Sequence, residues 1–171
     1  MLNLLLIIVL VICVITDLKS RKIYNNVIFP SLLLAFLLNG ILLGWSGLFS
    51  SLLGFSCGLV ILLIPYLMGG MGAGDVKLLA LIGAIKGSSF VFISAIYMGF
   101  IGGLIGLIIL LLRKGAFQRL KSITYSISGI TYGMRIPLGL DKEGLESTYP
   151  YGLAIAGGAA LAFFLNGAVL L

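Results

Sequence analysis

Histidine is absent from this 171-residue chain, and cysteine and acidic residues are scarce. Without histidine, the chain cannot build a Ser-His-Asp or Cys-His catalytic site, a histidine-ligated metal site or a histidine proton relay. The two cysteines, Cys13 and Cys57, form no Cys-x-x-Cys pair and no zinc-ligand spacing, so we predict that they are buried apolar residues. We therefore expect no metal site and no cofactor. No motif for binding DNA or RNA is visible either.

Charge is also scarce, because charged residues make up 9% of the chain and hydrophobic residues 61%. A soluble domain has about 25% charged residues, so the composition indicates an integral membrane protein. A chain of this length has room for about six apolar helices of roughly 20 residues each, and for little else. We predict an all-α bundle of about six transmembrane helices that forms a single domain over residues 1–171.

The predicted spans cover residues 2–16, 27–44, 48–68, 75–87, 89–112 and 150–171. An uncharged turn near Trp45 separates the second span from the third. The fourth span is short for a complete crossing at about 1.5 Å per residue. Within the polar segment 113–148, residues 116–130 carry apolar side chains at helical spacing, which predicts an amphipathic helix on the inner membrane surface.

The positive residues predict the orientation of the chain. No lysine or arginine precedes the first apolar segment and no small-x-small cleavage site follows it, so residues 1–16 are expected to remain as a first span with the N-terminus outside. In this orientation every one of the 11 lysines and arginines except Lys86 lies in a cytoplasmic loop. The net charge of +6 is then explained by orientation and by contact with anionic lipids. We predict a multi-pass protein of the cell membrane.

Two of the five acidic residues, Asp17 and Asp75, lie at the edges of apolar segments, and the predicted orientation places both on the cytoplasmic side. An ionisable group near the bilayer interior is costly, so each is a candidate functional residue. Each also has a plainer interpretation. Asp75 begins an apolar helix and could be its N-cap. Asp17 could be an interfacial residue that is balanced by Lys19, Arg21 and Lys22.

Two carboxyls that lie close together can form an aspartic protease dyad. Like charges resist simultaneous ionisation, so the pair would share one proton. The ionised member would take a proton from water, which attacks a peptide carbonyl, and the protonated member would donate to the carbonyl oxygen. A helix start favours negative charge, which favours Asp75 as the ionised member, whereas Lys19 and Arg21 near Asp17 favour the reverse assignment, so the sequence leaves both open. If the two acids are not catalytic, they could instead bind and release protons or cations in a transporter.

The stretch Asp17–Asn25 resembles the Asp-x-(basic)-x-(basic)-x-Ile-Pro-Asn stretch of type IV prepilin peptidases, with Tyr24 in place of the proline. Residues 71–78, Met-Gly-Ala-Gly-Asp-Val-Lys-Leu, are similar to the Gly-x-Gly-Asp-(Val/Phe)-Lys motif of that family. Residues 149–152, Tyr-Pro-Tyr-Gly, resemble the Pro-(Phe/Tyr)-Gly stretch that opens a late span. The order and the separation of the motifs also fit.

The resemblance implies a membrane aspartic endopeptidase that cuts the leader peptide from prepilin-like precursors (pilins, pseudopilins or preflagellins) at the cytoplasmic face. The cut would fall after a glycine and before the hydrophobic helix of the precursor. Asp17 and Asp75 map onto the two catalytic aspartates, with Gly72, Gly74 and Lys77 as supporting residues of the second motif.

Lys77 could contact lipid headgroups or tune the ionisation of Asp75. It could also serve only to orient the chain in the membrane. Lys19, Arg21 and Lys22 are candidates to contact lipid or an early acidic residue of the substrate. The chain resembles the short form of the family, without the N-terminal zinc-binding domain of the long members, which leaves N-methylation of the product open. Its oligomeric state is also left open.

Three other interpretations remain. Presenilin-type proteases also use a Gly-x-Gly-Asp motif, but their first aspartate lies inside a span. A small proton- or cation-coupled transporter could use Asp17 and Asp75 as carriers, although such a protein favours acids near mid-membrane and an inverted repeat. A structural assembly protein would use the acids only as caps.

Overall fold

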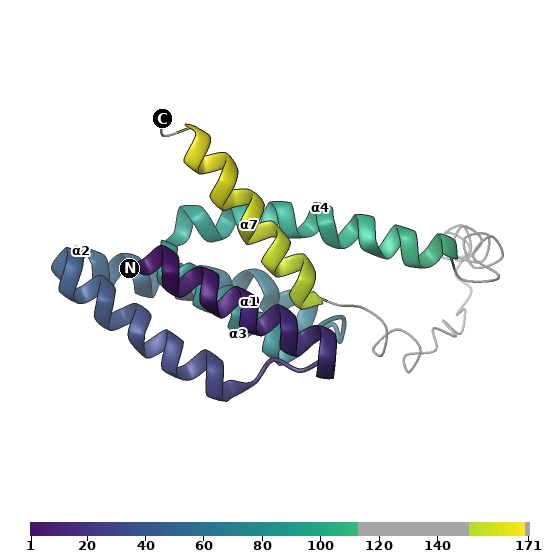
Figure 1. Cartoon of the computed structure of the whole chain (residues 1–171), viewed down its shortest axis with the longest axis horizontal. Helices are drawn as coiled ribbons and strands as arrows, with labels where there is room; N and C mark the ends of the chain where they lie inside the picture. The colour runs from purple at the N-terminus through teal and green to yellow at the C-terminus, as the bar shows by residue number, and fades with distance from the viewer. Residues whose placement is uncertain (113–150, 170–171) are drawn as a thin grey trace, which may run out of the picture. The chain divides into compact units, whose positions relative to one another are not determined.

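Every element of the computed structural model is an α-helix within the part of the chain that it describes, residues 1–112 and 151–169 (Figure 1). The elements are α1 (Leu2–Ser20), α2 (Asn25–Leu67), α3 (Ala73–Lys86), α4 (Ser88–Leu112) and α7 (Tyr151–Val169). The all-α prediction is confirmed for these residues. The amphipathic helix predicted at 116–130 lies outside them.

The structure divides into two compact units. One consists of Met1–Gly102 with Pro150–Leu171, and the other of Gly103–Tyr149. Of the second unit, only the last turns of α4 are described. The candidate site lies in the first unit, to which the contacts below belong. The expectation of a single domain stays a prediction.

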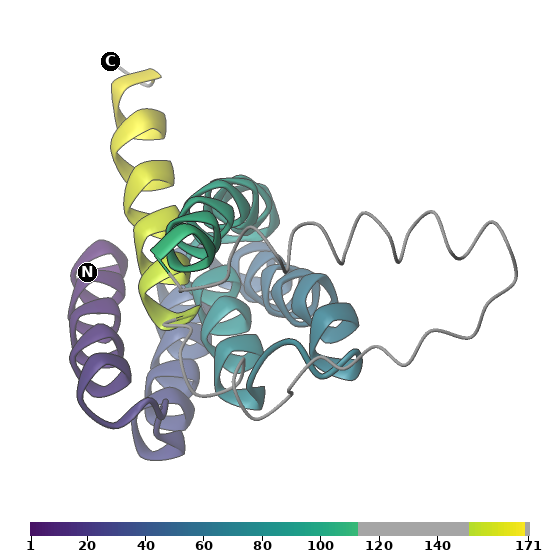
Figure 2. The same cartoon turned by 90° about the vertical axis from the view of Figure 1, so that its right-hand side faces the viewer.

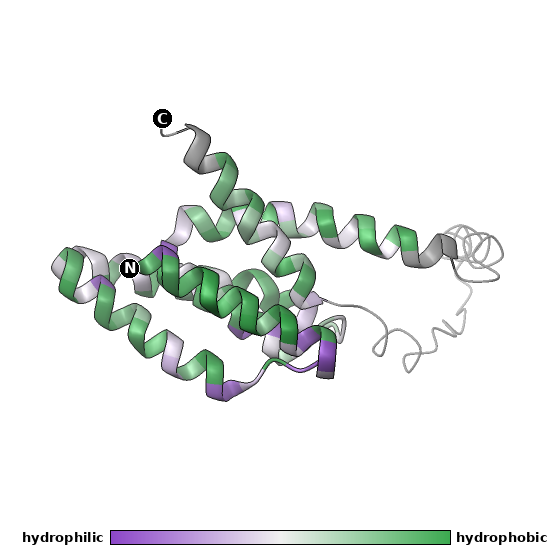
Figure 3. Ribbon diagram, in the orientation of Figure 1, coloured by the Kyte–Doolittle hydropathy of each residue, from purple (hydrophilic) through white to green (hydrophobic). Residues whose placement is uncertain are grey.

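Three helices, α1, α2 and α4, are long and apolar enough to cross a membrane. Apolar residues cover most of their length, and hydrophilic residues gather toward helix ends (Figure 3). α1 continues beyond the predicted end at residue 16, through Asp17 to Ser20. The helices therefore support a membrane protein, and the number of about six spans stays a prediction.

The element α2 is a hairpin of two helical arms, although its 43 residues form one continuous element. Gly44 has a φ of 64° and a ψ of −148°, a conformation that only glycine adopts easily. The rings of Phe36 and Phe55 are 6.0 Å apart between centroids, whereas a straight helix would separate these residues by about 28 Å. The turn predicted near Trp45 is confirmed to within one residue, because the chain reverses at Gly44 and Trp45–Gly47 already belongs to the second arm.

The short helix α3 is the innermost one, and it contacts α1, α2 and α7 (Figure 2). Its residues from Leu78 to Ile85 are almost completely buried. The second arm of α2 reaches α3 through glycines, because a Cβ added at Gly54 would overlap the carbonyl oxygen of Gly83. Small residues of this kind let helices in a membrane approach closely. The seam between α2 and α3 therefore holds the bundle together.

Side chains of α2 satisfy the C-terminal end of α3. The last carbonyls of a helix have no partner within the helix. The carbonyl oxygen of Ala84 accepts hydrogen bonds from the buried side chains of Asn39, at 3.2 Å, and Ser51. These two residues come from the two arms of the hairpin. The polar contacts fix α3 along its axis and so fix the height of its other end, where Asp75 lies.

Candidate active site

Asp17 lies in the last turn of α1, and its side chain is 9% exposed. The helix ends at Arg21, which adopts a left-handed conformation with a φ of 51° and donates its N–H to the Asp17 carbonyl oxygen at 2.8 Å. The C-terminal end of a helix carries a partial negative charge and disfavours a carboxylate. The groups that stabilise this carboxyl therefore have to belong to another element.

That element is α7, whose first turn lies against the Asp17 carboxyl. A Cβ added at Gly152 would be 2.6 Å from Asp17 Oδ2 and 3.0 Å from Asp17 Cβ, so only glycine leaves room for the aspartate. The backbone N–H groups of Gly152 and Leu153, in the first turn of α7, lie beside the carboxyl. The first N–H groups of a helix lack partners within it and attract anions. The N-terminus of α7 therefore offsets the unfavourable end of α1.

Gly152 was not among the site residues predicted from sequence. The stretch of residues 149–152 did mark the start of a late helix, and a glycine directly after a Pro-Tyr pair was the available signal. Nothing in the local sequence connects this glycine with Asp17, because the two positions are 135 residues apart.

Asp75 is the third residue of α3 and is 8% exposed. Its Oδ2 accepts a hydrogen bond from the N–H of Gly72 at 3.2 Å, and its own N–H donates to the Gly72 carbonyl at 3.1 Å. The carboxylate thus satisfies a backbone donor at the helix start, as in half of a capping box. Asp75 does act as a cap, and this contact also holds the carboxyl in a fixed position.

Gly74 brings the connection between α1 and α2 next to this helix start. A Cβ at Gly74 would lie 2.9 Å from the Cβ of Ile23. Ile23 is two residues beyond Arg21, where α1 ends. The glycine therefore allows the segment that follows Asp17 to pack directly against the helix that carries Asp75.

The structure brings the two predicted aspartates together at one end of the bundle. α1 and α3 are in contact, and the carboxyls of Asp17 and Asp75 are close enough to interact electrostatically. Both side chains are buried. In the described residues, Asp17 Oδ2 has no hydrogen-bond partner that meets the usual geometry. One carboxyl oxygen, Asp75 Oδ2, thus accepts a backbone hydrogen bond, and another, Asp17 Oδ2, is buried against the first turn of α7.

Lys77 does not bind Asp75. Its Nζ donates a hydrogen bond to Asn25 Oδ1 at 2.9 Å and lies 5.5 Å from the centre of the Phe29 ring. Asn25 and Phe29 belong to the first turns of α2. Lys77 therefore links the second sequence motif to the end of the first, and it ties the start of α3 to the start of α2.

The three remaining basic residues predicted near the site, Lys19, Arg21 and Lys22, are exposed around the end of α1. The structure places them at the same end of the bundle as both aspartates. No group of three histidine, cysteine or acidic residues that could hold a metal ion occurs within the described ranges.

The chain was compared with curated proteins, with solved structures and with models of protein families. No curated protein and no solved structure matches the chain at a significant level. The sequence does match the model of the type IV leader peptidase family over residues 4–111. The match includes Asp17, Asp75 and Lys77, ends before α7, and covers more than half of the chain. The chain therefore belongs to the type IV leader peptidase family.

Proposed function

We propose that the protein is a membrane aspartic endopeptidase that removes the leader peptide from type IV prepilin-like precursors. Membership of the leader peptidase family supports a peptidase. The observation that carries the aspartic mechanism is the burial of two carboxyls, from α1 and α3, within electrostatic reach of each other. Like charges at such a site favour a state in which one proton is shared by the pair.

In the proposed mechanism, Asp75 is the ionised member. Its hydrogen bond from the Gly72 N–H and its place in the first turn of α3 support this assignment. Asp17 is the protonated member, and the burial of its Oδ2 without a hydrogen-bond partner among the described residues supports a neutral carboxyl there. The pair as a whole, rather than either residue, sets the protonation behaviour.

The reaction follows from these two states. Asp75 takes a proton from water while the water oxygen bonds to the carbonyl carbon of the scissile peptide, and Asp17 gives its proton to the carbonyl oxygen. The resulting gem-diol collapses as the carbon–nitrogen bond breaks. Asp75 returns its proton to the departing amine, and Asp17 takes one from a gem-diol hydroxyl. Both carboxyls are then back in their starting states.

The distribution of charge supports a cytoplasmic site. Lys77 is in the first turns of α3 near Asp75, whereas Lys86 ends the same helix. Lys19, Arg21 and Lys22 follow or flank Asp17. A cytoplasmic location for the end with most positive residues satisfies the positive-inside rule and leaves Lys86 toward the outside. We propose about six crossings of the cell membrane, with the N-terminus outside.

The substrate in this proposal has a short basic leader, a glycine before the cleaved bond and an apolar helix after it. The exposed Lys19, Arg21 and Lys22 are suited to contact an acidic residue of the precursor near the cut. If cleavage is unaffected when all three charges are removed together, that contact does not exist.

The test is cleavage of a co-expressed prepilin in membranes by the wild type, Asp17→Asn and Asp75→Asn. Asparagine is nearly isosteric, and its amide oxygen can still accept the hydrogen bond from Gly72, so a purely capping role tolerates the change. We expect each variant to lose at least about 100-fold in rate, as is typical for a general acid or base. Mass spectrometry of the precursor and product measures the rate.

Ser20→Ala is the matched control, since Ser20 is exposed and one turn or less from Asp17. It should cleave as the wild type does, and all variants should reach similar membrane levels. Normal cleavage by either aspartate variant would rule out the two-aspartate mechanism.

A further inference from the structure

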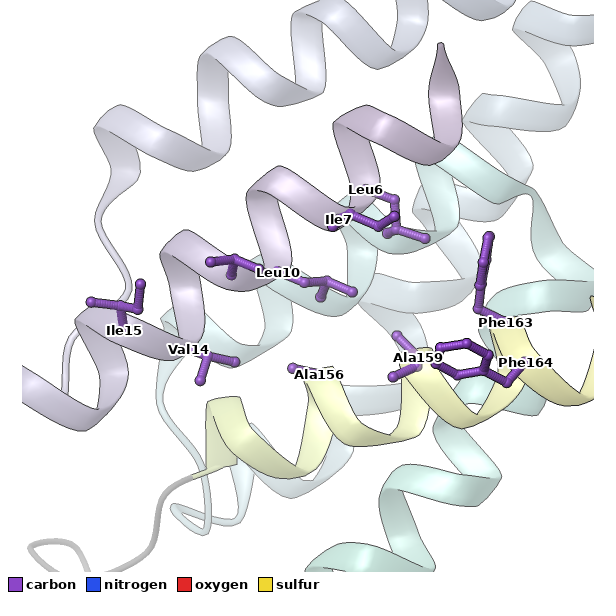
Figure 4. A pocket seen from close by; sticks show the side chains of 11 residues that line it. Leu6, Ile7, Leu10, Val14, Ile15, Ala156, Ala159, Phe163 and Phe164 are labelled. Atoms are coloured by element: carbon purple, nitrogen blue, oxygen red, sulfur yellow. The ribbon is translucent and has the colours of Figure 1, made fainter.

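An apolar groove of about 420 Å³ lies between α1 and α7 (Figure 4). All the residues that line it are apolar. The α1 side includes Leu6, Leu10 and Val14, and the α7 side includes Ala156, Ala160 and Phe163. The groove thus lies between the same two helices that together position the Asp17 carboxyl.

One end of the groove lies next to the candidate site. Val14 and Leu10 precede Asp17 by three and seven residues, so they lie on the same face of α1. On the other wall, Ala156 follows Gly152 by four residues, or about one helical turn. The groove therefore runs toward the Asp17 carboxyl, which the first turn of α7 covers at this end.

At the other end of the groove, a lysine contacts an aromatic side chain that lines it. Phe163 lines this end, and its ring centre is 5.0 Å from the Nζ of Lys86, which is also 5.4 Å from the ring of Phe90. These cation–π contacts hold α7 against the end of α3. Between Leu6 and Val14 the groove follows α1 for eight residues, about 12 Å or two helical turns.

We propose that this groove binds the apolar helix of the peptide substrate and places the peptide bond that precedes this helix at Asp17. The proposal rests on the function proposed above. The continuity of the groove with Asp17 and Gly152 argues for a peptide. So does the Oδ2 of Asp17, a buried polar atom beside the end of the groove that has no hydrogen-bond partner among the described residues. A lipid chain could fill the groove but would bring no peptide bond to that oxygen.

The α7 wall suits a helix. Ala156, Ala159 and Ala160 are spaced by three and four residues along it. In lipid, apolar burial gives little drive for association, so small side chains that allow close backbone approach decide where helices pack. The larger side chains of α1 form the opposite wall.

Disulfide cross-linking tests the location. The probe is a fusion protein with a lysine-rich leader, a glycine at the cleavage point and an apolar helix of about 20 residues, with single cysteines along that helix. A chain with Cys13→Ala and Cys57→Ala must first cleave the probe. With Asp75→Asn added to stop turnover, Val11→Cys places a thiol in the groove. Ile12→Cys is the matched control on the next, exposed residue, which does not line it.

We expect Val11→Cys to cross-link the apolar helix of the probe at least several-fold more efficiently than Ile12→Cys. Equal cross-linking, or cross-links from Val11→Cys only to a second copy of this chain or to its own residues, would overturn the proposal. If the cysteine-free chain and the wild type both fail to cleave the probe, the proposed function fails and the groove proposal fails with it.

Filling the groove provides a second, independent measurement. Ala160→Phe reduces its volume, whereas Leu161→Phe changes an exposed neighbour that does not line it. We expect Ala160→Phe to raise KM for the probe roughly tenfold, equivalent to about 1.4 kcal/mol, with a smaller effect on kcat, and Leu161→Phe to leave both unchanged. Normal KM in Ala160→Phe, at normal membrane levels, would show that the groove holds only lipid. Cleavage would then persist and the proposed function would stand.

Discussion

At the scale of single residues, the site depends on the absence of a side chain as much as on the two acids. Asp17 lies at a helix end that disfavours its charge, and it is buried because α7 begins directly against it. Gly152 makes that approach possible. Asp75 has a simpler environment, since its cap contact comes from Gly72, three residues earlier.

We expect Gly152→Ala to reduce cleavage strongly. The new methyl group would overlap the Asp17 carboxyl, so either α7 or the carboxyl must move. A displacement of about 1 Å in a catalytic group can cost about 100-fold in rate. Cleavage of a prepilin in membranes measures the effect, with Gly99→Ala as the control because an added Cβ there meets nothing within 4 Å. Wild-type rates in Gly152→Ala would mean that the contact between α7 and Asp17 does not matter for catalysis.

At the scale of elements, the short helix α3 is held from several sides. Its start carries Asp75 and is tied to α2 by the bond between Lys77 and Asn25. Its end is tied to α2 by Asn39 and Ser51. A helix of 14 residues that is buried all round gains its position from these neighbours rather than from its own length. The close approach of Gly54 to Gly83 sets the distance between the two elements.

Gly54→Ala should therefore destabilise the bundle, because an added Cβ would overlap the backbone of Gly83. Overpacking of this kind typically costs about 1–3 kcal/mol, which outweighs the gain in helix propensity. The thermal midpoint in detergent should fall by several degrees. Gly40→Ala, in the first arm of α2 and with nothing within 4 Å of the new Cβ, should leave the midpoint unchanged or slightly higher. An unchanged midpoint in Gly54→Ala would argue against the glycine seam.

At the scale of the whole molecule, the first compact unit has two chemically different ends. The end of α1 and the starts of α2, α3 and α7 bring the aspartates and most of the nearby positive residues together. The turn of the α2 hairpin lies about 28 Å further along its first arm, which is close to the hydrocarbon thickness of a bilayer. The proposed orientation in the membrane is based on this difference in charge between the two ends.

The orientation predicts opposite labelling of two exposed positions in the cysteine-free chain. Trp45→Cys, at the hairpin turn, should react with a membrane-impermeant maleimide in intact cells. Ser20→Cys, at the exposed end of α1, should react only after permeabilisation. Retained cleavage activity confirms that both variants are folded. The reverse pattern would place the aspartates outside and exclude cleavage at the cytoplasmic face.

The sequence by itself determined the class of the protein and the identity of the candidate catalytic pair. Membrane helices are local features, so an apolar run between polar residues was enough to predict them. Asp17 and Asp75 could be selected because acids are so rare beside apolar segments, and the family indicated by their motifs is confirmed by the match over residues 4–111. The hairpin turn was predicted to within one residue, and its exact place at Gly44 follows from the positive φ that the reversal needs there.

Only the tertiary structure decided how the site is assembled. The contact of Gly152 with Asp17, the bond from Lys77 to Asn25 and the groove between α1 and α7 all join segments that are far apart in the chain. Hydropathy shows that a segment is apolar but not which face meets which neighbour. Those faces are chosen by side-chain volume and by the need of helix ends for partners, and both are satisfied only when the helices pack.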